Sequence, residues 1–180
     1  MAKLVSKRYA LALFETGLEL EKLEQFKEEI NYVSNVLDAE PKIEMVLTHP
    51  KVTNNEKKEL LDSLFKKNIS QEMLNFLYVI IDKRRERYIR EISEYYDFLY
   101  NEEKNIVLAT VVTAVPIGKA EEEKLKTTLT KKLNKDVQLK NVIDDSIIGG
   151  VMLKVDNKVI DGSIKGQLDS IMKNLKAMRV

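Results

Sequence analysis

Few residues in this sequence have the types and spacing that enzyme chemistry requires. The chain has 180 residues, no cysteine and one histidine, His49, which stands directly before Pro50. Thiol nucleophiles, thiolate metal sites and disulfides are therefore excluded. No serine or carboxylate motif accompanies the imidazole, so His49 is interpreted as a helix-end or turn residue rather than a base or a ligand. We expect no catalytic residues, no metal site and no cofactor.

The glycines do not form a phosphate-binding loop. Gly118-Lys119 is similar to the end of such a loop, but Thr113 holds the position of the earlier glycine and Ala120 that of the hydroxyl residue. Three other glycines also lack the spacing of a dinucleotide-binding fingerprint. We interpret them as positions where a sheet requires close backbone approach or a positive φ: Gly149, Gly150 and Gly162.

One basic cluster could hold phosphate groups: Lys83, Arg84, Arg85, Arg87 and Arg90. Acidic residues are interleaved at spacings that allow salt bridges, which favours a helix end whose charges pair with one another: Asp82, Glu86, Glu91 and Glu94. The whole chain has 30 basic and 29 acidic side chains, so no global field attracts nucleic acid or an anionic membrane. We expect no nucleic-acid partner, and a phosphate-binding helical adaptor is the alternative.

The first hundred residues have helical periodicity, and the first helix is apolar on two sides. One stripe contains Leu4, Leu11, Phe14 and Leu18, and the roughly opposite one contains Val5, Tyr9, Ala12 and Leu13. A surface helix needs only one such stripe, so the second packs either inside the same bundle or on a partner.

Local signals separate the helices that follow. Pro41 ends the second helix, and Thr53 with Glu56 has the spacing of a capping box. Ser70 begins a further helix, and another apolar stripe follows near Tyr96. About six helices result, two of them short.

At residue 105 the period changes to that of a strand, which predicts a second domain. The segment 106–115 is rich in β-branched residues, a helix follows over 121–134, and a strand over 137–143. A hairpin with a turn at Asp156-Asn157 comes next. Ser163 then caps a last helix with apolar positions Ile164, Leu168, Ile171, Met172 and Leu175. We predict an α+β protein: a six-helix bundle over 1–104, then a small β-sheet domain with two helices over 105–180.

Two motifs resemble the family of the delta subunit of bacterial F-type ATP synthase, to which the mitochondrial oligomycin-sensitivity-conferring protein is related. Residues 8–14, Arg-Tyr-Ala-Leu-Ala-Leu-Phe, are similar to its first-helix motif. Residues 143–150 and 159–163 resemble its more specific carboxy-terminal signature, here with Gly149, Gly150, Asp161, Gly162 and Ser163. The resemblance covers nearly the full length of the chain.

The resemblance implies a non-catalytic stator that joins the catalytic head to the peripheral stalk, so that ion-driven rotation is coupled to ATP synthesis. In the family, the N-terminal bundle holds the N-terminal helix of an alpha subunit in a groove between the first and fifth helices. Tyr9, Ala12 and Val79 match groove positions, and Val5 and Ile80 are neighbours by helical spacing. The carboxy-terminal domain of the family contacts the b subunits of the stalk.

The resemblance implies a protein that is a monomer when isolated and present in one copy per complex. No apolar stretch approaches the roughly 20 residues that cross a bilayer, and the helical pattern starts at Leu4 without a signal peptide. We therefore expect a peripheral protein at the cytoplasmic face of the bacterial membrane, with no direct membrane insertion.

The chain departs from the family pattern between the fifth and sixth helices. The family commonly has an Asn-Gly type turn there, whereas this chain has Lys83-Arg84-Arg85 and no glycine or proline between Ser70 and Pro116. Glycine makes a positive φ easy. Either the turn is strained, or the two helices are nearly continuous.

Overall fold

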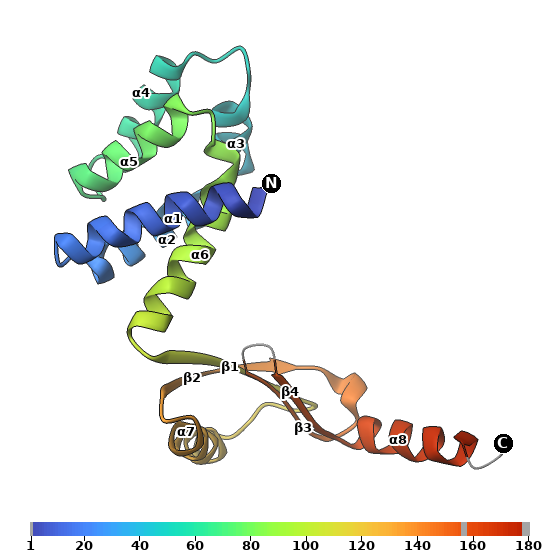
Figure 1. The fold of residues 1–180 in the computed structure, drawn as a ribbon. Helices are drawn as coiled ribbons and strands as arrows, with labels where there is room; N and C mark the ends of the chain where they lie inside the picture. The colour runs from blue at the N-terminus through green and yellow to red at the C-terminus, as the bar shows by residue number, and fades with distance from the viewer. Residues whose placement is uncertain (1, 156–157, 178–180) are drawn as a thin grey trace. The chain divides into compact units, whose positions relative to one another are not determined.

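The computed structural model describes residues 2–155 and 158–177, and the chain divides into two compact units, residues 1–101 and 102–180. Within the described residues the order of elements is helical at first and then mixed, as the predicted α+β class requires (Figure 1). The predicted change from helices to strands falls between the end of α6 at Glu103 and the start of β1 at Ile106. The turn predicted at Asp156-Asn157 lies outside the described residues.

Unit 1 is built from helices: α1 (Ala2–Glu19), α2 (Leu23–Ala39), α3 (Pro41–Thr48), α4 (Asn54–Phe65), α5 (Gln71–Asp82), a turn of 3-10 helix η1 (Glu86–Tyr88) and α6 (Ile89–Glu103). The side chains predicted to cap α4 and α5 do so in the structure. The Thr53 hydroxyl accepts the Glu56 N–H at 3.3 Å, and the Glu56 carboxylate accepts the Thr53 N–H at 2.8 Å, which completes the capping box. Ser70 caps α5 by accepting the Met73 N–H at 3.3 Å.

The core of unit 1 is made of large side chains that are fully buried, among them Phe26, Phe65, Leu77 and Tyr96. The Tyr96 hydroxyl donates to the Leu23 carbonyl at 3.0 Å, so this buried polar group is satisfied. Burial, the largest cause, raises the pKa of Tyr96 well above its usual range.

The buried face of α1 differs from the first predicted stripe. Leu4, Leu11 and Leu18 are exposed, and of that stripe Phe14 lies in the core. The buried face runs through small residues, which give little hydropathy signal but let other helices approach closely: Ser6, Ala10 and Gly17, together with Leu13. A Cβ at Gly17 would lie 3.0 Å from Leu23 Cδ2 and 3.1 Å from the Tyr96 hydroxyl.

The connection between α5 and α6 is a turn, so these helices are not continuous. Arg84 has a φ of 52° in the left-handed region that usually favours glycine. Its N–H donates to the Ile81 carbonyl, and the Arg85 N–H donates to the Ile80 carbonyl, both at 2.9 Å. This pair of bonds is the Schellman pattern that closes a helix end. An arginine therefore occupies a left-handed conformation that glycine adopts more easily.

The predicted pairing of charges within the basic cluster is wrong. Glu86 accepts instead from the buried Lys57 of α4 at 2.5 Å, and Asp82 pairs with Lys58 at 2.8 Å. Arg90 pairs with Asp38 and with Glu44, which lie on α2 and α3. The acidic residues tie neighbouring helices together, because α4 packs beside α5 (Figure 1) and its lysines pair with Asp82 and Glu86 at the turn that follows α5.

In the part that the structure describes, unit 2 is a four-stranded sheet with two α-helices. The strand order is β2-β1-β3-β4, with β1 (Ile106–Thr113), β2 (Asp136–Ile143), β3 (Gly150–Val155) and β4 (Lys158–Ser163). β1 is parallel to β2 through the crossover helix α7 (Lys119–Leu133), and the other pairs are antiparallel. A short 3-10 turn η2 (Asp145–Ile147) precedes β3, and α8 (Ile164–Ala177) follows β4. This is the predicted β-α-β-β-β-α order.

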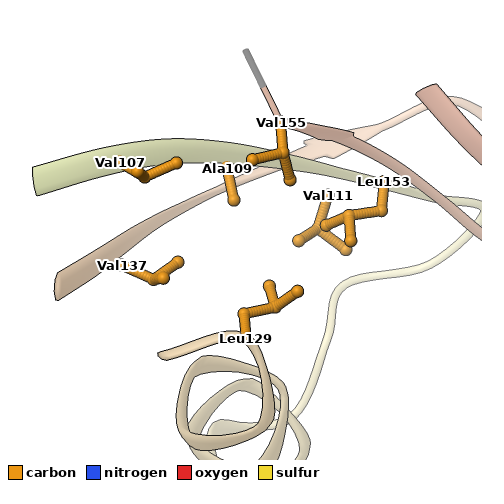
Figure 2. Close-up of a cluster of buried hydrophobic side chains, with 7 residues drawn as sticks. All are labelled: Val107, Ala109, Val111, Leu129, Val137, Leu153 and Val155. Carbon is orange, nitrogen blue, oxygen red and sulfur yellow. The ribbon is translucent and has the colours of Figure 1, made fainter. Parts of the chain in front are cut away.

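The core of unit 2 lies between α7 and one face of the sheet. Figure 2 shows Leu129 of α7 directed toward the aliphatic side chains of the strands. Alternation places every second strand residue on this face, as in the buried set Val107, Ala109 and Val111 of β1. The remaining members of the cluster are Val137, Leu153 and Val155.

Candidate partner-binding groove

A groove of about 610 Å³ runs along α1 in unit 1. One wall is the face of α1 that repeats with helical spacing, and the other comes from the turn after α5 and from η1. The residues that line it are Leu4, Val5, Arg8, Tyr9 and Ala12 on α1, then Arg85 and Tyr88. Val5, Tyr9 and Ala12 of the second apolar stripe therefore face an open groove, whereas Leu13 of that stripe lies in the core.

Contacts inside unit 1 hold the groove residues in place. The Tyr9 ring meets Phe76 of α5 edge to face, with centroids 6.4 Å apart. The Arg85 guanidinium lies 6.0 Å from the centroid of the Tyr88 ring. Leu4, by contrast, is 67% exposed, and Ala12 is also exposed. The groove is thus formed in the isolated chain, and apolar surface in it is open to solvent.

Three of the five groove residues named from the sequence line this groove: Val5, Tyr9 and Ala12. Val79 is 48% exposed on α5 but is outside the lining. Ile80 is fully buried, so its predicted place on the groove surface is wrong. The physical reason is that adjacent residues of a helix point about 100° apart, so the neighbour of an exposed residue can face the core.

Sequence reasoning missed four lining residues: Leu4, Arg8, Arg85 and Tyr88. A signal existed for Arg8, which lies one helical turn before Ala12 and after Leu4. No such signal existed for Arg85 and Tyr88, because the left-handed Arg84 redirects the chain after α5. The turn brings both residues to the groove.

The glycines and polar residues of the carboxy-terminal motif organise the junction between the hairpin and α8. Gly150 has a φ of +77°, and a Cβ there would lie 2.4 Å from the Gly162 carbonyl oxygen. A Cβ at Gly162 would lie 3.0 Å from the Val151 carbonyl oxygen. The interpretation of these glycines as points of close approach is correct, with a positive φ at Gly150.

Hydrogen bonds complete this junction. The Gly149 carbonyl accepts the Ile164 N–H at 3.0 Å, and the Asp161 carboxylate accepts the Ser163 N–H at 2.8 Å. Ser163 caps α8 by accepting the Gly166 N–H at 3.0 Å. Hydrogen bonding from Ser163 holds the pKa of Asp161 below its usual value. These motif residues stabilise a local turn and a helix start.

A second exposed apolar surface lies on unit 2. Along α8 the exposed residues are spaced by three, four or one positions, as on one side of a helix: Ile164, Leu168, Ile171 and Met172. Val159 and Ile160 of β4 are also exposed. The side chain predicted to extend this stripe, Leu175, lies outside the described side chains. We call the set on α8 the α8 stripe.

The described residues contain no group of three or more histidine, cysteine, aspartate or glutamate side chains placed to hold a metal ion. In the same part of the chain, none of the helices combines the length and the apolar character that a membrane span requires.

Comparison with known proteins settles the family. Residues 5–175 match the family model described as ATP synthase delta (OSCP) subunit. This chain belongs to that family. A relative from Alkaliphilus oremlandii, named ATP synthase subunit delta, is 42% identical over 180 residues, which is all of both chains. One of the same name from Bacillus mycoides is 36% identical over 177 residues, 98% of each chain.

A solved structure shows the same fold at lower sequence identity. A chain in the cryo-EM structure of the Toxoplasma gondii mitochondrial ATP synthase hexamer aligns with a TM-score of 0.76 and 21% identity. The alignment covers 94% of this chain and 96% of that one. The predicted two-part α+β fold is thereby confirmed.

Membership of the family confirms the predicted role. The chain is a non-catalytic stator subunit of an F-type ATP synthase, a component of the peripheral stalk that links to the catalytic head. It is peripheral to the membrane within that complex.

Proposed function

We propose that the α1 groove binds the amino-terminal helix of an alpha subunit, while unit 2 contacts the b subunits of the stalk. Binding of the alpha-subunit helix is supported by the open apolar groove, which is lined on one side by Val5, Tyr9 and Ala12. An amphipathic helix lays its apolar face into such a groove. The small Ala12 admits a close helix, and Tyr9 supplies apolar area with a polar tip.

The proposed contact suits the mechanical task of a stator. Rotation exerts torque on the catalytic head, and ATP is made only if the head is held still relative to the membrane sector. A joint under torque needs slow dissociation, which a buried, well-packed apolar contact supplies. No reactive side chain is required for this task.

The α8 stripe supports the second half of the proposal. A helix that buries its apolar side needs a partner surface, and the spacing of Leu168, Ile171 and Met172 suits packing against another helix. Together the two units bridge head and stalk at the cytoplasmic face of the membrane. The chain acts as one copy per complex and is a monomer when isolated.

The groove assignment is tested by calorimetric titration of the full chain with a synthetic peptide of the first 20 or so residues of the host's alpha subunit, long enough for a helix of about 30 Å. Wild type is expected to bind one peptide, with an affinity that largely survives high salt. Ala12→Asp is expected to weaken binding by about 100-fold or more, because it buries an unpaired charge. Its circular dichroism and melting should match wild type.

Leu11→Asp is the matched control, since Leu11 is exposed on α1 but lies outside the groove lining. This variant should bind the peptide as wild type does. Equal affinities for Ala12→Asp and wild type would remove the groove assignment, and so would an equal loss in both aspartate variants.

A further inference from the structure

The groove carries two arginines that its apolar character does not explain. Arg8 projects from α1 and Arg85 from the turn after α5, and both line the groove. Among the described residues that line the groove, none is acidic. The whole chain has a net charge of +1, so this concentration of positive charge is local.

Neither guanidinium is in an ion pair with another part of the chain that the structure describes. This distinguishes them from Arg90, which pairs with Asp38 and Glu44 across three helices. Arg85 also lies against the Tyr88 ring, which orients an otherwise exposed side chain beside the groove. Two cations therefore line the groove, and the Tyr88 ring orients one of them, Arg85.

Both arginines lie beside apolar groove residues. Along α1, Arg8 stands one helical turn after Leu4 and one turn before Ala12, and all three line the groove. Tyr9 packs on Phe76, and α1 also contacts η1, which supplies Tyr88. The groove therefore combines apolar surface with two cations.

We infer that the helix held in this groove carries at least one carboxylate beside its apolar face, placed opposite Arg8 and Arg85. The inference rests on the proposed function and adds to it the chemistry of the partner. A cation left facing apolar surface loses hydration, whereas guanidinium and carboxylate form charge-assisted, often bidentate, hydrogen bonds. The apolar contact supplies most of the affinity, and the charges fix the register and direction of the bound helix.

The test is a double-mutant cycle by calorimetry with the full chain. The chain variants are Arg8→Gln and Arg85→Gln. The probes are the alpha-subunit peptide and versions in which each aspartate or glutamate is replaced singly by asparagine or glutamine. Arg85→Gln should weaken binding of the native peptide about fivefold at low salt, and less at high salt. One neutralised peptide should lose that same factor against wild type and lose little more against Arg85→Gln.

Arg87→Gln is the matched control. Arg87 is exposed and lies 6.0 Å from the same Tyr88 ring, but it is outside the groove lining. It should change the affinity less than twofold, within the range of unpaired surface charges. A loss equal to that of Arg85→Gln would mean that any positive charge near the turn suffices, and would overturn the inference.

The outcomes separate this inference from the proposed function. If wild type binds and Ala12→Asp does not, but no peptide carboxylate couples to Arg8 or Arg85, the groove stands and the inference fails. The inference fails in the same way if the bound peptide has no carboxylate. If wild type does not bind the peptide at all, both fail.

Discussion

The two units handle their apolar surface in opposite ways. In unit 1 large side chains such as Phe26 and Tyr96 are fully buried, and the candidate site is a groove that a partner enters. In unit 2 the core lies on one face of the sheet, while α8 leaves Ile171 and Met172 more than half exposed. Unit 1 therefore presents an apolar groove, and unit 2 presents the exposed apolar side of a helix. Both forms suit partners that are helices.

The units also differ in the setting of a non-glycine residue that has a positive φ. In unit 1 the left-handed Arg84 is part of a helix end closed by two hydrogen bonds. In unit 2 Ile148 has a φ of 70°, which is a rare conformation for a β-branched residue, and its side chain is 61% exposed. The first is a satisfied turn, and the second is a strained position beside the α8 junction.

The largest effect is expected from the buried ion pair of unit 1. Lys57→Ala leaves the Glu86 carboxylate buried without its partner, which costs about 3–5 kcal/mol of unfolding free energy. Chemical denaturation followed by circular dichroism measures this loss, and hydrogen exchange should locate it in α4 and η1 rather than in the sheet.

Lys58→Ala is the control for that experiment. Lys58 pairs with Asp82 in a more exposed setting, so its loss should cost less than about 1 kcal/mol. Equal losses in the two variants would show that burial of the Lys57–Glu86 pair has no special weight. Loss of protection in the strands of unit 2 would show that the two units unfold together.

A smaller effect, of opposite sign at two nearby positions, is expected in unit 2. Gly150→Ala places a Cβ against the Gly162 carbonyl at positive φ and should cost about 1–3 kcal/mol or more. Ile148→Gly relieves a strained conformation and removes an exposed side chain, so it should stabilise unit 2 by up to about 1 kcal/mol. Thermal unfolding and hydrogen exchange of β3 and β4 measure both changes.

Gly149→Ala is the control for Gly150→Ala. A Cβ there meets only the flexible end of Ile164, at 2.9 Å, and no positive φ is involved. Its cost should be well below that of Gly150→Ala. If Gly149→Ala and Gly150→Ala were equivalent, or if Ile148→Gly destabilised unit 2, then backbone conformation would not control this junction.

The smallest effect is a dependence of stability on alkaline pH in unit 1. The Tyr78 hydroxyl donates a short hydrogen bond to Asp62, which together with burial raises the pKa of Tyr78 to about 12. Below about pH 10 the phenol is protonated in both the folded and the unfolded chain, so the contribution is fully present. Between about pH 10 and about pH 12 the unfolded chain loses the proton first, and stability falls.

Tyr78→Phe should remove this part of the alkaline slope and cost about 1 kcal/mol at neutral pH. Asp62→Asn keeps an acceptor but removes the charge, so its slope should lie between those of the other two. Unfolding midpoints in urea at several pH values supply the test. An identical alkaline slope in wild type and Tyr78→Phe would contradict the raised pKa.

Local signals in the sequence predicted the parts of the fold that depend on neighbouring residues. The Thr53–Glu56 capping box and the Ser163 cap involve groups three residues apart, so residue types and spacing suffice. The conformation of Gly150 was predictable because few other residues tolerate it. The change from helical to strand periodicity near residue 105 was also predictable, because it depends only on the order of apolar and β-branched residues along the chain.

The rest depends on tertiary placement. The buried face of α1 uses Ser6, Ala10 and Gly17, whose role is close approach and not hydrophobicity. Helical spacing placed Ile80 near Val79 but could not tell which of the two faces the core. The groove contribution of Arg85 depends on the left-handed Arg84, and the Lys57–Glu86 pair joins residues 29 positions apart. None of these has a local sequence signal.

If the chain bridges head and stalk through two separate surfaces, it must hold both partners at once, which assembly of the ternary complex tests. The full chain is mixed with the alpha-subunit amino-terminal peptide and the soluble part of the b subunits, and the mass is followed by analytical ultracentrifugation. We expect both partners to bind together, Ala12→Asp to lose only the peptide, and Leu168→Asp on α8 to lose only the b subunits. Competition between the two partners, or loss of both in either variant, would contradict it.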